Sequence, residues 1–340
     1  MKKIFFTLLV SCLFIFASAK VITINNNPNS PSKYTNLQTA IDSASSGDTI
    51  YIQGSTINYG NVTIKKRLNL FGTGNNPNKS NKLVSALGSL QFDTVQGISG
   101  ASGSKIIGFN LNSIFGYGGS IGTNNILIAR NYFNSGSTFI KITGMSWTVE
   151  NNIFSSGLVN LNNSSNTIIR NNIFNGSNLF NSNQPTVVIS NNLFLGNSQT
   201  TALSTISDCL ISNNIFSGSS PVEVGVTNNI FSNNITYQTS STIPFGTNTG
   251  SGNLVAQNPK FVNAPTNVFY YYYDFALAPS SPGKNAGTDG KDIGIYGGAR
   301  PFVDLTGTPS VPQVKSISIL NPVLSLGGGL RVTVKAKKQN

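Results

Sequence analysis

The stretch Thr167–Phe174, TIIRNNIF, decides the fold, because close copies of it recur along the chain. The copies read ILIARNYF, WTVENNIF, VVISNNLF, CLISNNIF and VGVTNNIF. Their closing phenylalanines are separated by 21, 20, 20, 22 and 15 residues and are Phe133, Phe154, Phe174, Phe194, Phe216 and Phe231. A period near 20 residues predicts a solenoid of stacked coils.

This eight-residue repeat, which we call the phrase, also predicts the structure of each coil. Apolar residues at alternate positions indicate a strand with one inward face, and the paired asparagines indicate a bend, since asparagine tolerates the left-handed conformation. Stacked coils would bring equivalent side chains to about 4.8 Å, close enough for amides to form a hydrogen-bonded ladder. The predicted members of this ladder are Asn131, Asn152, Asn172, Asn192, Asn214 and Asn229. We expect the phenylalanines to form a second, apolar ladder in the core.

The same alignment divides the other positions between core and surface. Trp147 and Cys209 align with inward residues, so we expect them in the core. The residues one and six positions before each phenylalanine should point outward, yet most of them are apolar. Two outer apolar stripes need cover, and we expect it from the loops after the phenylalanines, from the C-terminal tail or from another molecule.

The N-terminus carries a predicted signal peptide, residues 1–19. Lys2 and Lys3 precede an apolar run, and Ala17-Ser18-Ala19 forms a small-residue cleavage site near Ala19. We therefore expect a secreted or cell-surface protein. A lipoprotein cleavage site at Cys12 is the alternative. No later segment reaches 18 uninterrupted apolar residues, so no transmembrane segment is expected.

The repeats and the entry segment, residues 35–54 (TNLQTAIDSASSGDTIYIQG), resemble the pectin-lyase-like right-handed parallel β-helix superfamily. Within it, the chain is most similar to secreted repeat proteins of Bacteroidetes type. The resemblance implies an all-β solenoid with coils of about 20–22 residues. It also implies a capping helix near residues 37–45. It indicates fold more than activity, because similar coils carry enzymes, adhesins and structural proteins.

The domain prediction follows from these segments. Residues 20–300 should form the β-helix domain with both of its caps. Residues 301–340 should form a proline-punctuated linker and a short β-hairpin, with strands at 314–320 and 330–334. Because the hairpin has an apolar face to bury, we expect it to dock on the β-helix.

The composition offers few candidate catalytic residues. The chain has no histidine, which excludes Cys/His zinc sites and Ser-His-Asp triads, and only ten acidic residues. Asp208 and Glu223 each lie eight residues before a phenylalanine, so they should stack about 5 Å apart. Such a pair could bind Ca²⁺ or act as acid and nucleophile. The alternative is two solvated turn residues, and we assign no catalytic residue, no cofactor and no metal site.

Three further clusters have structural and functional readings. Glu150 and Arg170 should form a surface salt bridge. Lys65-Lys66-Arg67 is expected to be a solvated turn. The run Tyr270, Tyr271, Tyr272 and Tyr273 could present rings that stack on sugars, or could pack in the C-terminal cap.

The leading functional hypothesis is a non-catalytic protein that binds a polysaccharide or another cell-surface component. The first alternative is a polysaccharide lyase or glycoside hydrolase acting on an acidic polysaccharide, which would suit the net charge of +12. A second alternative is a self-associating or ice-binding solenoid, although the threonine rows that ice binding favours are absent. No nucleic-acid-binding motif is present.

Overall fold

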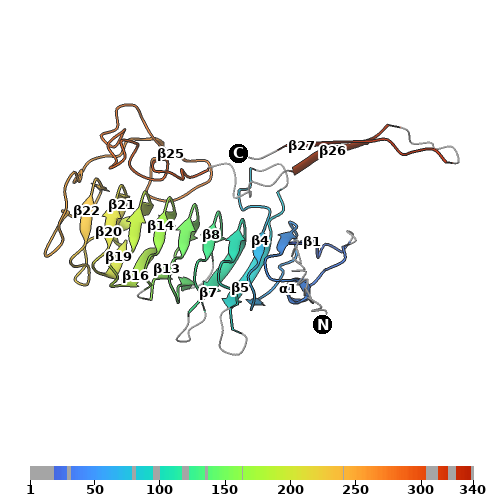
Figure 1. Ribbon diagram of the computed structural model, residues 1–340. Coiled ribbons are helices and arrows are strands. Elements are labelled where there is room, and N and C mark those ends of the chain that lie inside the picture. Colours follow the sequence, from blue (N-terminus) through green and yellow to red (C-terminus); the bar gives the residue numbers. More distant parts are fainter. Residues whose placement is uncertain are drawn as a thin grey trace, which may run out of the picture.

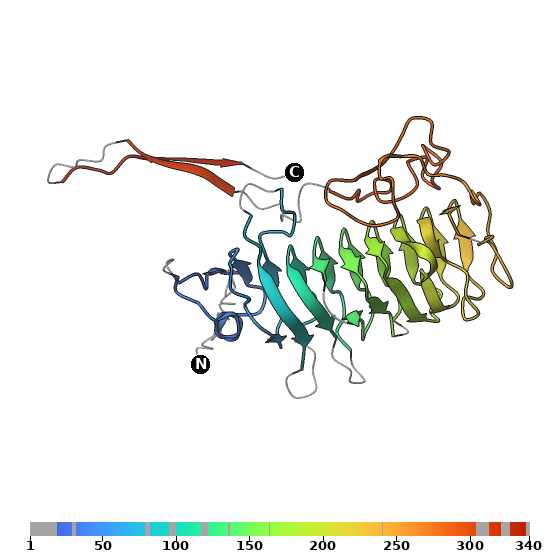
Figure 2. The ribbon, with the colours of Figure 1, turned by 180° about the vertical axis from the view of Figure 1, so that it is seen from behind.

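The computed structural model describes residues 19–28, 32–78, 82–94, 100–116, 122–134, 137–162, 164–239, 241–303, 313–320 and 327–337. Cys12 and residues 1–18 of the predicted signal peptide lie outside these ranges. The described chain is a right-handed parallel β-helix with one short helix and a C-terminal hairpin, which confirms the predicted fold class (Figures 1 and 2).

A ten-stranded parallel sheet forms one wall of the solenoid. Buried and more exposed residues alternate in most of its strands, as the phrase predicts. Its strands, in spatial order, are β1 (Val21–Ile24), β2 (Thr49–Ile52), β4 (Asn69–Phe71), β6 (Lys105–Ile107), β8 (Leu127–Ala129), β11 (Thr148–Glu150), β14 (Ile168–Arg170), β17 (Val188–Ser190), β20 (Leu210–Ser212) and β22 (Ile230–Ser232).

A thirteen-stranded sheet forms the remaining walls, and for most of its length it holds two rows of strands. The first row contains β9 (Tyr132–Phe133), β12 (Ile153–Ser155), β15 (Ile173–Asn175), β18 (Leu193–Thr201), β21 (Ile215–Ser220) and β23 (Ile235–Tyr237). The second row contains β10 (Thr138–Lys141), β13 (Leu158–Asn160), β16 (Asn178–Ser182) and β19 (Leu203–Ile206). Near the N-terminal end lie β3 (Val62–Ile64), β5 (Ala86–Phe92) and β7 (Asn110–Phe115), the last of which pairs with both rows.

The N-terminal end is closed by α1 (Leu37–Ser43), two residues shorter than predicted. Asn36 caps its N-terminus by accepting from the Thr39 backbone N–H, and the helix buries three apolar side chains against the first coils. At its C-terminus, Lys66 Nζ donates to the carbonyls of Asp42 (2.9 Å) and Ala44 (2.8 Å). The predicted basic turn thus has a structural role, because it satisfies carbonyls that the helix leaves unpaired.

The second asparagine of each pair is buried and forms a continuous ladder, which we call the inner ladder. Asn152 Nδ2 donates to Asn172 Oδ1 (3.0 Å) and to the Ile128 carbonyl of the preceding coil (2.9 Å), and the same pattern repeats at each step. The members in order are Asn131, Asn152, Asn172, Asn192, Asn214, Asn234 and Asn253.

Asn229 does not belong to the inner ladder, and this corrects the predicted register. The sixth phrase occupies the ten-stranded sheet, where Phe231 pairs with Ile211, whereas Phe216 is followed by Thr236 in the other sheet. Asn229 instead accepts from the Cys209 backbone N–H (2.9 Å). The 15-residue spacing arises because Phe231 is equivalent to Ile211, five residues before Phe216 in the preceding coil. The stacked phenylalanine rings therefore run only from Phe133 to Phe216, with centroids of adjacent rings 4.6–4.9 Å apart.

The left-handed residue of each bend is the first asparagine of the pair. Asn151, Asn171, Asn191 and Asn213 have φ values between 52° and 58°. Their side chains point away from the core, so the first asparagine of each pair faces outward while the second belongs to the buried inner ladder. In the first phrase Arg130 takes this position, with φ 57°.

The C-terminal hairpin consists of β26 (Gln313–Ile319) and β27 (Val332–Lys337), paired antiparallel. Figures 1 and 2 show it extending away from the solenoid. Its apolar residues Ile319 and Val334 are each 55% exposed, so the expectation that the hairpin docks on the β-helix is wrong. No helix within the described ranges is long and apolar enough to span a membrane.

We predict that Asn172→Leu destabilises the fold. The substitution leaves the carbonyl of Val149 and the backbone N–H of Asn152 without their amide partners in the buried wall. We expect a loss of about 2–4 kcal/mol in the free energy of unfolding, measured by chemical denaturation. The control is Asn183→Leu, at an exposed position. Equal unfolding midpoints for the two variants would contradict the assigned role of the ladder.

Candidate functional site

A segment that returns along the outside of the solenoid shapes its main surface features. We call residues 254–303 the returning segment; it includes β24 (Phe261–Asn263) and β25 (Asp274–Leu277). It leaves the last coil and lies over the outer face of the first-row strands, as Figures 1 and 2 show. This brings residues near 300 beside Asn151, a coil in the middle of the repeat region.

The first asparagines of the pairs bind this segment, so we call them the outer row. Asn171 Nδ2 donates to the carbonyls of Ile295 (2.9 Å) and Gly297 (3.0 Å). Asn213 Nδ2 donates to Thr288 Oγ1 (2.9 Å), and the Thr288 N–H donates back to Asn213 Oδ1. The other contacts of the row are Asn151 with Arg300 and Val303, Asn191 with Gly294, and Asn233 with Ala286. This role was not predicted from the sequence, although the first asparagine recurs almost as regularly as the second.

The returning segment covers one of the two predicted apolar stripes. The residues before the phenylalanines of β12 to β21 are 0–4% exposed, and they pack with Phe275, Leu277, Ile293 and Ile295. The need for cover was predicted correctly, but the covering element was not, because it is neither the hairpin nor the loops after the phenylalanines. The second stripe, on the ten-stranded sheet, is partly open: Leu210 is 41% and Ile230 is 45% exposed.

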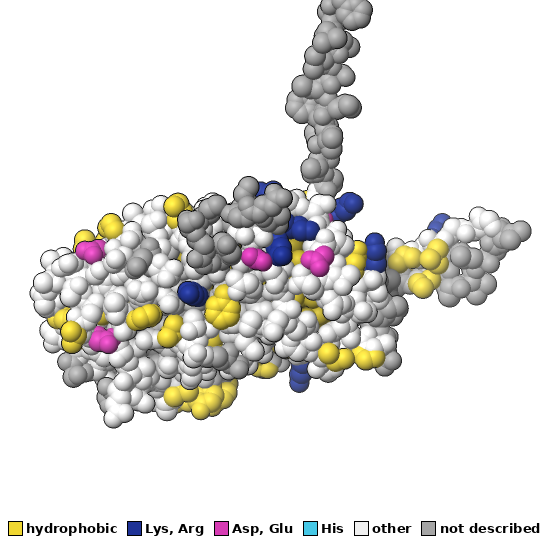
Figure 3. Space-filling model, turned by 90° about the horizontal axis from the view of Figure 1, so that it is seen from below, with side chains coloured by type: hydrophobic (Ala, Val, Ile, Leu, Met, Phe, Trp, Pro, Cys, Tyr) yellow, Lys and Arg dark blue, Asp and Glu magenta, His cyan; other side chains and the backbone are white. Residues whose placement is uncertain are grey.

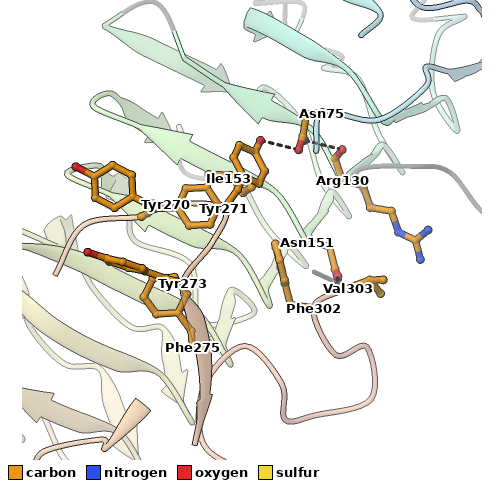
Figure 4. Close-up of a pocket in the computed structure, with 11 residues that line it drawn as sticks. Asn75, Arg130, Asn151, Ile153, Tyr270, Tyr271, Tyr273, Phe275, Phe302 and Val303 are labelled. Carbon is orange, nitrogen blue, oxygen red and sulfur yellow. Dashed lines mark hydrogen bonds between the residues drawn. The ribbon is translucent and has the colours of Figure 1, made fainter. Parts of the chain in front are cut away.

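The four tyrosines divide between the two predicted roles. Tyr271 faces the body, where its hydroxyl donates to Asn75 Oδ1 (2.8 Å) and Asn75 in turn donates to the Arg130 carbonyl (Figure 4). Burial raises the pKa of the Tyr271 phenol. Tyr270 and Tyr272 are 44% and 69% exposed, and their rings stack at 5.2 Å with an interplanar angle of 20°. Tyr273 packs edge-on against both rings.

An open groove lies beside this tyrosine cluster, along the turns between the two rows of the thirteen-stranded sheet. Its floor takes one residue from each of five successive coils: Ser156, Gly176, Gly196, Gly218 and Gln238. The first three directly follow paired strand residues, whereas a register shift precedes Gly218, which pairs with Leu195. Residues 265–268 of the returning segment form one wall, and Asn175, Asn197 and Thr200 complete the lining. Thr266 joins the two features, since it lines the groove and its hydroxyl lies 3.2 Å from that of Tyr273.

Glycine at position 218 allows the wall of the groove to approach the floor. A Cβ atom there would lie 2.6 Å from Asn267 Nδ2 and 2.1 Å from the Gly196 carbonyl oxygen, and Gly218 has a φ of 74°. The wall is then held by hydrogen bonds from Ser217 Oγ to Asn267 Oδ1 (2.7 Å) and from Asn267 Nδ2 to Gln238 Oε1 (2.6 Å). The Phe269 N–H donates to Asn175 Oδ1 (2.9 Å). Hydrogen bonds to three coils therefore hold this wall in place.

The predicted acid pair is not assembled. Asp208 stacks with Asn228, because its N–H donates to the Thr227 carbonyl and both residues are left-handed. Glu223 lies five residues before Asn228, outside this stacked position, and neither acid lines the groove. The shifted register of the sixth phrase explains the error. Among the described residues no group of three His, Cys, Asp or Glu side chains could hold a metal ion.

Most other described acids have structural partners. Glu150 Oε2 accepts from Arg170 Nε (2.8 Å) and Nη2 (2.6 Å), which confirms the predicted salt bridge. Asp292 pairs with Lys284 at 2.7 Å. Asp48 accepts from the backbone N–H groups of Lys20 and Ser45. Their carboxylates are engaged in holding turns and neighbouring strands, and none lines the groove.

Trp147 and Cys209 lie in the core, fully buried, as predicted. The Trp147 indole donates to the Thr123 carbonyl, which satisfies its one polar atom. The Cys209 thiol lies near Ser182 Oγ (3.4 Å) and the Ser207 carbonyl (3.2 Å). Burial raises the pKa of this thiol from 9.0 to about 11.

No protein-family model matches the chain, and no curated protein matches it in sequence. Among solved structures it is similar to XylC in complex with xylose, with 10% identity, 65% of this chain and 54% of that chain covered, and a TM-score of 0.36. It is also similar to the PL6 family alginate lyase AlyGC, with 16% identity, 84% and 48% coverage and a TM-score of 0.35. The chain spans about half the length of these proteins, and at these values the likeness says nothing about activity.

Cys209 should make stability depend on pH in alkaline solution. The unfolded thiol loses its proton near pH 9, whereas the folded thiol keeps it to about pH 11, so stability falls as pH rises through this window. We expect Cys209 to account for a loss of about 2 kcal/mol between pH 8 and pH 11. Urea unfolding of the native protein and of Cys209→Ala isolates this contribution. The same pH dependence in both proteins would show that the thiol is not protected.

Truncation after Val303 should leave the β-helix intact. The returning segment already covers the first-row stripe, and the hairpin belongs to neither buried cluster of side chains. We expect the melting temperature of the truncated protein to match that of the full chain within about 2 °C. A truncated protein that unfolds much earlier would mean that the hairpin stabilises the solenoid.

Proposed function

We propose that this protein is a secreted or surface-located β-helix that binds a glycan without chemically altering it. The observation that carries the proposal is the groove, whose described lining offers amides, hydroxyls and open glycine backbone beside two exposed, stacked tyrosines. Binding sites for small molecules and sugars combine concave shape with a few placed polar groups. Aromatic rings add apolar faces that suit the C–H face of a sugar ring.

The composition of the groove favours binding over hydrolysis. A glycoside hydrolase needs two carboxyl groups about 5–9.5 Å apart across the scissile bond. The described lining contains no aspartate or glutamate, and Asp208 and Glu223 are absent from it. Figure 3 shows the molecule from below, where the charged and hydrophobic side chains are scattered among backbone and uncharged polar side chains. A lyase that removes a sugar-ring proton would likewise need a base at the groove, and none of the described lining residues is ionisable.

Removing one exposed ring should weaken glycan binding. Tyr272 is 69% exposed, so its substitution should disturb the fold little. We expect Tyr272→Ala to lower the affinity for a bound polysaccharide about tenfold, and Tyr272→Phe, which keeps the ring, to retain most of it. Affinity gel electrophoresis against a panel of polysaccharides measures both variants.

The same incubations test the enzymatic alternative. Reducing ends and unsaturated sugars are assayed after prolonged contact with each polysaccharide. We expect neither product to form. Sugar release that disappears in Asp208→Asn or Glu223→Gln would overturn the non-catalytic assignment, and a lack of binding across the panel would overturn the proposed function itself.

A further inference from the structure

The groove carries no charge in a protein that is strongly basic. The chain has a net charge of +12, yet none of the described lining residues is a lysine, arginine, aspartate or glutamate. Several cations have partners elsewhere: Arg170 with Glu150, Lys284 with Asp292, and Lys66 with the end of α1. The positive charge of the molecule is therefore not concentrated where the groove would meet its ligand.

The polar groups of the groove suit hydroxyls better than carboxylates. An amide offers both donors and an acceptor, as does a hydroxyl, whereas a carboxylate only accepts and is held most strongly by arginine or lysine. Gln238 Oε1 accepts from Asn267, which orients the amide and leaves Gln238 Nε2 without a partner among the described residues. Asn197 Oδ1 likewise accepts from the Gln199 N–H (3.0 Å) and the Thr200 hydroxyl, so its Nδ2 is presented to solvent.

The direction of the groove suits an extended polymer. Its floor advances by one residue per coil, and parallel strands lie about 4.8 Å apart, which is close to the length of one sugar unit. The floor offers open glycine backbone at three successive steps along the solenoid, Gly176, Gly196 and Gly218. Tyr273 lies at the side of this path, next to Thr266, and the exposed Tyr270 and Tyr272 pack against it.

From these observations we infer that the groove takes an uncharged polysaccharide, and that it excludes uronate polymers. This inference rests on the proposed function and specifies its ligand class. Burying a carboxylate against amides and glycine backbone would leave its charge without a cation, and that cost selects against acidic chains. Sugar hydroxyls meet no such cost.

The test compares neutral and acidic polysaccharides on the full chain. Xylan, mannan and a mixed-linkage β-glucan represent the neutral class, and alginate and polygalacturonate the acidic class. We expect a neutral polysaccharide to bind at least about tenfold more tightly than either uronate polymer. Its affinity should change less than about twofold when sodium chloride is raised from about 50 to about 500 mM, because screening acts on charge–charge attraction.

Three variants assign the binding to the groove. Gln238→Ala and Asn197→Ala should each lower neutral-glycan affinity about fivefold, while Gln257→Ala, an exposed amide outside the groove, should leave it unchanged. Gln238→Lys places a cation in the groove and should increase binding of the uronate polymers. Melting temperatures of all variants show that each is folded.

The outcomes separate this inference from the broader proposal. Tight, salt-sensitive binding of a uronate polymer that Gln238→Ala and Asn197→Ala weaken would place that polymer in the groove, and would overturn the inference while leaving glycan binding intact. Equal binding of both classes would also overturn it. Failure to bind any polysaccharide would remove the proposed function and the inference together.

Discussion

The structure depends on how buried amides are paired at one bend of each coil. An unpaired amide in the wall of a solenoid would cost several hydrogen bonds, and the cost would recur in every coil. Asn172 avoids it completely: its Nδ2 donates to Asn192, Val149 and Arg170, while its Oδ1 accepts from the N–H and the amide of Asn152. Each asparagine satisfies hydrogen-bonding groups of the neighbouring coils, so the ladder sets the register of the coils. The phenylalanine rings then stack as a consequence.

The outer asparagines extend this order to the surface. The bend requires a left-handed residue, and that backbone turns the first side chain of each pair away from the core. There it binds the backbone of the returning segment, which covers the first-row stripe and supplies a wall of the groove. The bend that the inner ladder requires thus also places Asn171 and its equivalents where they hold the returning segment, and with it a wall of the candidate binding groove.

The sequence was sufficient to predict the fold, the inner ladder as far as Asn214, the Glu150–Arg170 contact and the core positions of Trp147 and Cys209. Each of these depends on local spacing within one repeat. Predictions failed where the register shifts. The phrase around Phe231 looks like the others but lies in the ten-stranded sheet, so Asn229 was placed in the wrong ladder and Asp208 beside the wrong residue. The groove was missed because its wall comes from residues 265–268, and no periodic signal connects them to the coils they face.

The returning segment also has a consequence for how such a protein can change in length. A solenoid open at one end can gain or lose a coil without disturbing the others. Here the contacts from Asn151 to Asn233 span four coil steps, about 19 Å at one strand spacing each, and the segment meets every step. Duplication of one coil would leave the segment short and its outer asparagine without a partner. The returning segment therefore fixes the number of coils beneath it. Because Tyr271 also reaches Asn75, insertions should be tolerated before Asn75 more readily than beyond it.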